Sequence, residues 1–270
     1  MFARIRHVAI ITENYQRMAK FYQTIFGMKK ITSGMTDEKG DYNPDRGHIS
    51  DGVIGMALLQ RHPGNRSGID HYGFEVQDID TLLGRVKARY PELRVITSLE
   101  HVPFSVARML DPAGTHIDVS QQGVAKVREG YLEGGWDQPR QLSHVAIRSA
   151  NPAKLAEFYR EVFELKPVEG STENGGFCLT DGKVSVAILP CGKTSYKAMT
   201  EGLDHIGFKV EGVEKAKEEI EALSKSSPES APRKIDIGRF GPTTKKELAA
   251  CAMGQHPTTD PDGNLLDLLQ

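Results

Sequence analysis

The sequence predicts an α+β protein made of four β-α-β-β-β modules, and internal repeats are the main observation behind this prediction. Three short runs each occur twice: HVAI at residues 7–10 and 144–147, DHYGF at 70–74 and DHIGF at 204–208, and DPAGTHID at 111–118 and DPDGNLLD at 260–267. A repeat with a nearly fixed offset indicates a duplicated structural unit. The length of 270 residues suits two domains of ordinary size, one for each copy.

The first half contains the elements of two such modules. A strand over residues 5–11 opens the first module, and the apolar residues at three- and four-residue spacing that follow predict a helix ending near Gly27. Two strands come next and are joined by Ser50-Asp51-Gly52, since Asp-Gly between strand-like runs is typical of a hairpin. The second module repeats this order with a strand over 71–76, a helix over 79–90, a strand over 94–97 and a hairpin at 111–114.

The second half predicts the same order again. Its first helix begins with Pro152, which a first helical turn tolerates, and its hairpin turns at residues 180–182. A strand over 205–210 and a helix over 213–223 belong to the fourth module. Residues 224–233 are rich in Ser and Pro and are expected to form a loop, and residues 245–252 to form a short helix. We expect a first domain over 1–123, a linker over 124–140 and a second domain over 141–270.

Composition and charge exclude several classes of partner. The formal net charge is -2 and the isoelectric point is near 6.5, so neither a nucleic acid nor a membrane surface is expected as a partner. No apolar run approaches the roughly 18 residues that a membrane helix needs. The three cysteines show no CxxC spacing, and the chain starts in a strand-like segment without a signal-peptide pattern. These features predict a reduced, cytoplasmic setting.

The first strand of every module carries one histidine: His7, His71, His144 and His205. Because side chains alternate along a strand, each histidine shares its face with the residue two positions later. That residue is small in all four modules: Ala9, Gly73, Ala146 and Gly207. A small neighbour leaves room for a ligand beside the imidazole, whereas a histidine that merely fills a core would have a bulkier neighbour.

Each half also places one aspartate on its last strand, Asp118 and Asp267. Strand propensity disfavours aspartate, so two of them at equivalent positions indicate a function. An isolated strand histidine is more often structural, but two histidines with one carboxylate in each half form a facial set for Fe(II) or Mn(II), and Zn(II) or Ni(II) would accept these donors too. The expected metal ligands are His144, His205 and Asp267 in the second half and His7, His71 and Asp118 in the first.

The modules, the strand histidines and the Asp-Pro-Asp-Gly-Asn ending together resemble the vicinal oxygen chelate superfamily. Its members include glyoxalase I, type I extradiol dioxygenases, methylmalonyl-CoA epimerase and the bleomycin and fosfomycin resistance proteins. The resemblance covers nearly all of the chain outside the linker. It implies that two modules curl into a half-open mixed β-barrel with flanking helices around one metal. It implies less about the reaction, because this fold hosts many chemistries.

Within this superfamily, the ligand pattern is more similar to the extradiol dioxygenases than to glyoxalase. The dioxygenases take their ligands from the first strands of both modules and the last strand of the second, where this chain has its histidines and aspartates. They have a glutamate where this chain has aspartate, and ring-cleaving members keep one working site, in the second half. Glyoxalase-like members add a ligand from the last strand of the first module. We place that position at Leu59 or Gln60 and at Leu189 or Pro190, among which Gln60 could donate an oxygen.

The resemblance also implies an acid-base tyrosine upstream of the final carboxylate, where this chain has Arg108 and Pro257. His256, beside Pro257, is the expected catalytic replacement, and His116 is expected to act as a fourth ligand or a proton shuttle. Three residues are expected to bind substrate: Arg239, Arg108 and Tyr196. The alternative for each is a solvent-exposed loop or strand-edge residue. Asp70 and Asp204 are expected to point away from the site and cap the start of a strand.

Three functions follow from these observations. The first is an extradiol-type dioxygenase that uses Fe(II), the metal expected first, on a small vicinal-diol or enolate-like substrate. The second is a lyase, isomerase or epimerase whose metal acts as a Lewis acid. The third is a non-catalytic binder of a small drug or metabolite, against which six ligand-type residues argue. The sequence leaves open whether the domains pair within one chain or across a homo-oligomer.

Overall fold

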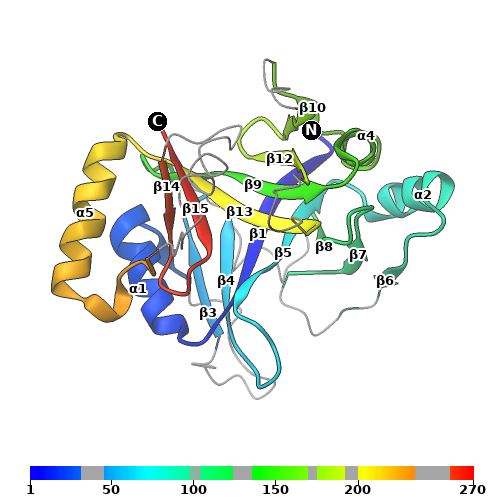
Figure 1. Ribbon diagram of the computed structural model, residues 1–270. Coiled ribbons are helices and arrows are strands. Elements are labelled where there is room, and N and C mark those ends of the chain that lie inside the picture. The colour runs from blue at the N-terminus through cyan, green and yellow to red at the C-terminus, as the bar shows by residue number, and fades with distance from the viewer. Residues whose placement is uncertain are drawn as a thin grey trace.

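Two mixed β-sheets form the centre of the molecule (Figure 1). The computed structural model describes residues 1–31, 46–97, 99, 104–123, 136–169, 175–191, 200–234 and 256–270. Over these residues the first sheet has the strand order β2-β3-β4-β1-β5-β8-β7-β6. Its strands are β1 (Ala3–Thr12), β2 (Lys29–Lys30), β3 (Arg46–Ser50), β4 (Gly55–Gln60), β5 (Gly68–Val76), β6 (Val95–Thr97), β7 (Ala107–Leu110) and β8 (His116–Gln121).

The second sheet repeats this arrangement with the order β10-β11-β12-β9-β13-β15-β14. Its strands are β9 (Gln141–Ser149), β10 (Lys166–Pro167), β11 (Phe177–Thr180), β12 (Ser185–Pro190), β13 (Gly202–Lys209), β14 (His256–Thr259) and β15 (Leu265–Leu269). In each sheet the first strands of two modules pair antiparallel at the centre, β1 with β5 and β9 with β13. The fold class expected from the repeats is confirmed. The division at residues 123 and 140 stays a prediction.

The helices begin and end where the sequence patterns place them, with one exception. They are α1 (Tyr15–Phe26), α2 (Ile79–Arg89), α4 (Pro152–Phe163) and α5 (Val213–Ser226). Asn14 caps α1 by accepting from the Arg17 N–H at 2.9 Å, and Gly27 ends it with a left-handed φ of 66°. The expected loop at 224–233 is wrong in part, because α5 continues to Ser226 and a 3-10 turn, η2, follows at Pro228–Ser230. The helix expected at 245–252 lies outside the described residues.

The helices pair across the two halves. Figure 1 shows α1 beside α5 on the left and α2 beside α4 on the right. Phe26 of α1 stacks on Phe208 of β13 at 3.8 Å between ring centroids, and Phe163 of α4 stacks on Phe74 of β5 at 4.0 Å. One cluster of buried apolar residues therefore runs through both halves, within one chain. None of the described helices is long and apolar enough to cross a membrane.

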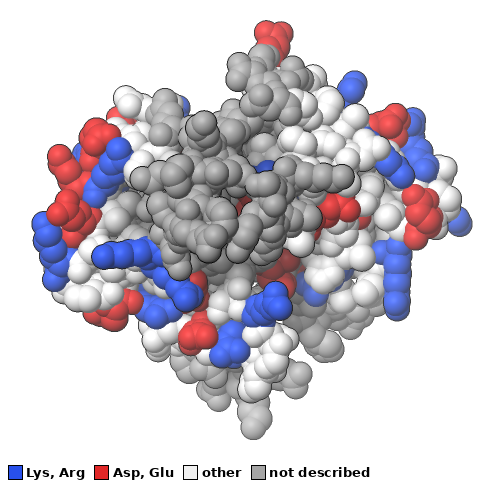
Figure 2. All heavy atoms as spheres, in the orientation of Figure 1, with Lys and Arg blue, Asp and Glu red and all other residues white. Residues whose placement is uncertain are grey.

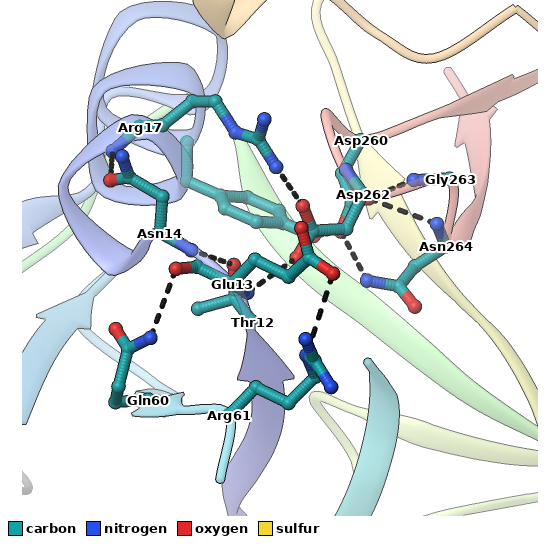
Figure 3. A network of polar contacts seen from close by, with 11 residues as sticks. Thr12, Glu13, Asn14, Arg17, Gln60, Arg61, Asp260, Asp262, Gly263 and Asn264 are labelled. Carbon is teal, nitrogen blue, oxygen red and sulfur yellow. Dashed lines mark hydrogen bonds and ion pairs between the residues drawn. The ribbon is translucent and has the colours of Figure 1, made fainter. Parts of the chain in front are cut away.

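Polar contacts reinforce this exchange between the halves. The Tyr22 hydroxyl of α1 donates to Asp260 Oδ2 at 3.1 Å, and the Tyr159 hydroxyl of α4 donates to Asp111 Oδ2 at 2.6 Å. Figure 3 shows how the start of α1 is tied to the last turn of the chain, where Asp262 accepts from the Arg17 guanidinium. On the surface, acidic and basic side chains are interspersed over α5 and the opposite end of the molecule (Figure 2).

Candidate metal centres

The alternation of strand residues separates a packed face from a second face, called here the site face. In β1, Val8 and Ile10 belong to the apolar core, so His7 and Ala9 lie on the other side of the sheet. In the second half, Ala146, Ala187 and Leu189 form a small buried cluster separate from the core. The site face of each sheet therefore carries the histidines, as the sequence pattern predicts.

In the second half, three donors converge on the site face. Gly207 of β13 pairs with His144 of β9 on one side and with Asp267 of β15 on the other. His144 Nε2 lies 3.3 Å from His205 Nε2 and 3.8 Å from Asp267 Oδ2. All three side chains are buried.

The first half brings its equivalent residues together in the same way. His7 Nε2 lies 3.1 Å from His71 Nε2, and His71 Nε2 lies 3.3 Å from Asp118 Oδ2. The ligand atoms within each triad lie within 4.8 Å of one another. Donors at about 2 Å from a shared ion are separated by about 3 Å when they occupy neighbouring coordination positions. Two nitrogens and one carboxylate oxygen at these separations fit one divalent metal.

Glycine at position 207 makes room for an imidazole of the site itself. A Cβ on Gly207 would lie 1.9 Å from His144 Cε1, so no other residue fits beside this ring. A Cβ on Gly73 would lie 2.6 Å from Phe104 Cε1 and 2.8 Å from the Asp118 carbonyl oxygen. Protein side chains thus fill the space beside Gly207 and Gly73, where a ligand was expected.

The aspartates that precede two of the histidines orient those rings. Asp204 Oδ2 lies 2.7 Å from His205 Nδ1, and Asp70 Oδ2 lies 2.7 Å from His71 Nδ1. The expectation that Asp70 and Asp204 only cap a strand is therefore wrong. A carboxylate on Nδ1 directs the Nε2 lone pair of the imidazole toward the shared ion position. Ser143 Oγ lies 3.0 Å from Nδ1 of His144.

Burial and the neighbouring carboxylates together set the pKa values of these histidines. The pKa of His144 is lowered to about 3 by burial and by the neighbouring His205, and burial also lowers the pKa of His7. Burial acts in the same direction on His71, but hydrogen bonds and the charges of Asp118 and Asp70 outweigh it and raise the pKa of His71. His144 and His7 are therefore neutral at pH 7, the state in which an imidazole can bind a metal.

The strand register corrects the position of the fourth ligand. In the module of His205, the ligand Asp267 pairs with Gly207, the residue two positions after the histidine. In the module of His144, the residue two positions after the histidine is Ala146, and it pairs with Ala187. Ala187 therefore occupies the position equivalent to Asp267. The same relationship in the first half leads to Ala57. The expected positions Leu59, Gln60, Leu189 and Pro190 are therefore wrong, and alanine occupies both places. At each site, three of the four equivalent strand positions therefore carry a side chain that can bind a metal.

Arg108, which was expected to bind substrate, is engaged by a carboxylate of the first-half triad. It pairs with Asp118 in the strand register, and its Nε and Nη2 donate to the two carboxylate oxygens of Asp118 at 2.5 and 2.9 Å. The second half has Pro257 at this position, opposite Asp267. The two triads therefore differ in their surroundings.

The two histidines expected to act in catalysis lie in different places. His116 is exposed and pairs with His71 at the start of β8. His256 pairs with Leu268, one position from Asp267, so it lies on the opposite face, near Lys217 and Glu214 of α5. This placement overturns the interpretation of His256 as a catalytic group. Arg239 and Tyr196 lie outside the described residues.

Two further residues of the first-half site are not among those predicted from the sequence. His48 of β3 is buried opposite Ala57 on the site face, and Phe104 stacks on the His7 ring at 4.8 Å between centroids. Strand alternation around Ile49 could have found His48. Phe104 precedes β7 in an irregular segment, where no periodic signal exists. The residue equivalent to His48 in the second half is Cys178, opposite Ala187.

Comparison with curated proteins gives a dioxygenase as a relative. The manganese-dependent 2,3-dihydroxybiphenyl 1,2-dioxygenase of Geobacillus genomosp. 3 is 25% identical over 201 residues, which are 69% of this chain and 61% of that protein. The chain thus spans less than two thirds of the length of this relative.

Solved structures share the fold at low sequence identity. The 2,3-dioxygenase LapB from Pseudomonas sp. KL28 superposes with a TM-score of 0.58 and 17% identity, covering 98% of this chain and 91% of that one. The Mn(II)-bound glyoxalase from Novosphingobium aromaticivorans has a TM-score of 0.61 and 15% identity, with coverages of 99% and 81%.

A family model accounts for both halves. The model of the Glyoxalase/Bleomycin resistance protein/Dioxygenase superfamily matches residues 4–119 and again residues 141–268. These ranges include all six residues of the two triads. The chain therefore belongs to the Glyoxalase/Bleomycin resistance protein/Dioxygenase superfamily.

Proposed function

We propose that this protein is a divalent-metal-dependent oxygenase of the extradiol type and that His144, His205 and Asp267 hold its working metal. One observation carries the proposal: three donors converge, while alanine occupies the strand position where a fourth ligand would stand. Two imidazoles and one carboxylate on one side of an ion leave its remaining positions open. A substrate with two adjacent oxygens fits those positions.

The chain's own residues prepare this site for such a substrate. Asp204 holds the His205 ring through Nδ1, and Gly207 allows His144 to lie over the central strand. A divalent ion on these donors would supply Lewis acidity to the substrate and, as Fe(II), electrons for the reaction with dioxygen. Ala187, Leu189 and Ala146 give the neighbouring wall an apolar character, which favours an aromatic or otherwise flat carbon skeleton.

The relatives support an oxygenase and leave the metal to be chosen. We keep Fe(II) as the first choice, because a two-histidine, one-carboxylate set is the usual site of non-haem Fe(II) oxygenases. The relative from Geobacillus is named as manganese-dependent, so Mn(II) is the first alternative. Zn(II) and Ni(II) would also accept the donors. The substrate we propose is a small vicinal diol or enolate, and the setting the cytoplasm.

The other two functions are less well supported. A glyoxalase-type lyase or isomerase would be expected to use the fourth ligand position, which Ala187 occupies. A non-catalytic binding protein would need no convergent donors, whereas both halves bury a complete set.

The test starts from protein purified without oxygen and loaded with Fe(II) or Mn(II). We expect one tightly held metal per chain, and oxygen uptake with catechol or 2,3-dihydroxybiphenyl accompanied by the absorbance of a ring-opened product. His205→Ala should abolish both, and the matched variant His71→Ala should leave both largely intact. Metal binding without oxygen uptake across a panel of vicinal diols would reject the oxygenase and favour the lyase or isomerase. Full metal content in His205→Ala would reject the ligand assignment.

A further inference from the structure

We infer that Arg108 prevents the first-half triad from binding a metal. Its guanidinium neutralises the charge of Asp118, as a bound metal would otherwise do. The inference uses the donor chemistry of the proposed function but concerns the other half of the chain. The equivalence of the two sites is the starting point. Arg108 faces Asp118 and Pro257 faces Asp267 at the same place in the two sheets.

The contact between Arg108 and Asp118 uses both carboxylate oxygens. Nε donates to Oδ1 at 2.5 Å and Nη2 donates to Oδ2 at 2.9 Å, which is the fork geometry of a bidentate arginine pair. Oδ2 is also the oxygen that faces His71 Nε2, at 3.3 Å. The oxygen that would bind a metal is therefore already engaged by a permanent cation.

Charge makes this arrangement unfavourable for a second cation. A guanidinium stays protonated at every physiological pH, and Asp118 supplies the single negative charge of the triad. The Asp118 side chain is 1% exposed, so water screens this carboxylate poorly, although the Arg108 side chain is itself 33% exposed. A divalent ion bound there would share its only anionic ligand with Arg108 and would lie beside a fixed positive charge.

Packing closes the same site from another direction. Phe104 stacks on His7 and reaches the space above Gly73, where a Cβ would touch its ring. Phe104 is 2% exposed. His7 of this triad thus has an aromatic ring against it, in addition to the charge of Arg108 beside Asp118. In the second half the residue paired with the carboxylate across the strands is Pro257, whose side chain carries no charge.

The consequence is an asymmetric protein: the second half binds metal and the first keeps its three donors without binding one. Removing the charge of Arg108 should therefore create a metal site from residues that are already in place. Arg108→Met is the suitable change, since methionine keeps an apolar stem of similar reach and has no charge.

The experiment counts Mn(II) ions by electron paramagnetic resonance during titration of metal-free protein. The background is His205→Ala, which removes the second-half site and so separates this inference from the proposed function. We expect no stoichiometric Mn(II) in His205→Ala and one ion per chain after Arg108→Met is added. A further His71→Ala should remove that ion. Arg108→Lys, which keeps the charge, should leave the site empty.

Two results would overturn the inference. One is a Mn(II) ion in the single variant His205→Ala that His71→Ala removes, because the site would then be open with Arg108 present. The other is a folded double variant, by near-ultraviolet circular dichroism, that stays empty. Arg108→Gln provides a second charge-free variant if Arg108→Met does not fold. Arg89→Met, which removes an arginine of α2 that pairs with Glu161 of α4, is the matched control and should leave the site empty.

Discussion

The Asp204 carboxylate lies 2.7 Å from Nδ1 of His205, on the side of the ring away from His144. This contact fixes the ring so that Nε2 faces the shared ion position. Replacing the carboxylate with an amide weakens that orientation and lowers the basicity of the imidazole. We predict that Asp204→Asn reduces metal affinity about 10- to 100-fold, measured by competition with a fluorescent chelator. Asp70→Asn, the same change in the first half, should leave the affinity as it is. Equal losses in the two variants would contradict this prediction.

The second prediction concerns Gly207, whose backbone lies close against the His144 ring in the metal site. A methyl group there would lie 1.9 Å from the His144 ring, so Gly207→Ala must displace that ring. We predict that the variant loses stoichiometric metal while keeping its secondary structure. Elemental analysis and far-ultraviolet circular dichroism provide the two measurements. Gly84→Ala is the control, because a Cβ at that position of α2 meets nothing within 4 Å. A fully metal-loaded Gly207→Ala protein would show that the ring position is wrong.

Asp260 predicts a component of stability that depends on pH. Burial raises the pKa of Asp260 to about 6, above the ordinary value of 3.8, so the folded protein holds this proton more tightly than the unfolded chain. The resulting stabilisation is complete below about pH 4 and is lost as the pH rises through about 6. Its size is about 3 kcal/mol for a shift of about two units.

Asp260→Asn removes the titrating carboxyl group. It keeps an oxygen that can accept the hydrogen bonds that three backbone N–H groups donate to Asp260 Oδ1. We predict that the stability of the variant relative to the native protein improves by about 3 kcal/mol between pH 4 and pH 7. Urea unfolding of both proteins without metal, at several pH values, measures the difference. A difference that stays constant over this range would be inconsistent with a raised pKa.

The sequence was sufficient for the strands, for their faces and for the convergence of the residues of each triad, because these depend on local alternation and on the duplication. The role of these residues as metal ligands stays a prediction. The sequence was insufficient wherever the position of a side chain depends on how two neighbouring strands are aligned. His256 was expected in the site, but a shift of one residue from Pro257 moves its side chain to the α5 face. The pairing of Arg108 with Asp118 depends on how the final hairpin aligns its two strands, which the residues of the turn do not reveal. Asp70 and Asp204 each directly precede a histidine of a triad, and this repeated Asp-His pair could have predicted that they contact those rings.

The last prediction concerns the contact that joins the two halves near their first strands. Asp51 Oδ2 accepts from the Leu142 N–H at 2.7 Å, and in the mirror arrangement Asp181 Oδ2 accepts from the Ile5 N–H at 2.7 Å. Asp51 is fully buried, so an amide nitrogen in place of Oδ2 would oppose the Leu142 donor without help from water.

We predict that Asp51→Asn lowers the free energy of unfolding by about 2 kcal/mol, the cost of one buried donor left without an acceptor. Asp181→Asn should lower the free energy of unfolding by a similar amount, because Asp181 Oδ2 accepts the equivalent hydrogen bond from the Ile5 N–H. Asp80→Asn, on the exposed first turn of α2, should change stability by no more than about 0.5 kcal/mol. Chemical unfolding followed by tryptophan fluorescence measures all three, since Trp136 lies against the turn at Gly52. If Asp51→Asn were as stable as Asp80→Asn, the aspartate contacts would not be what holds the halves in place.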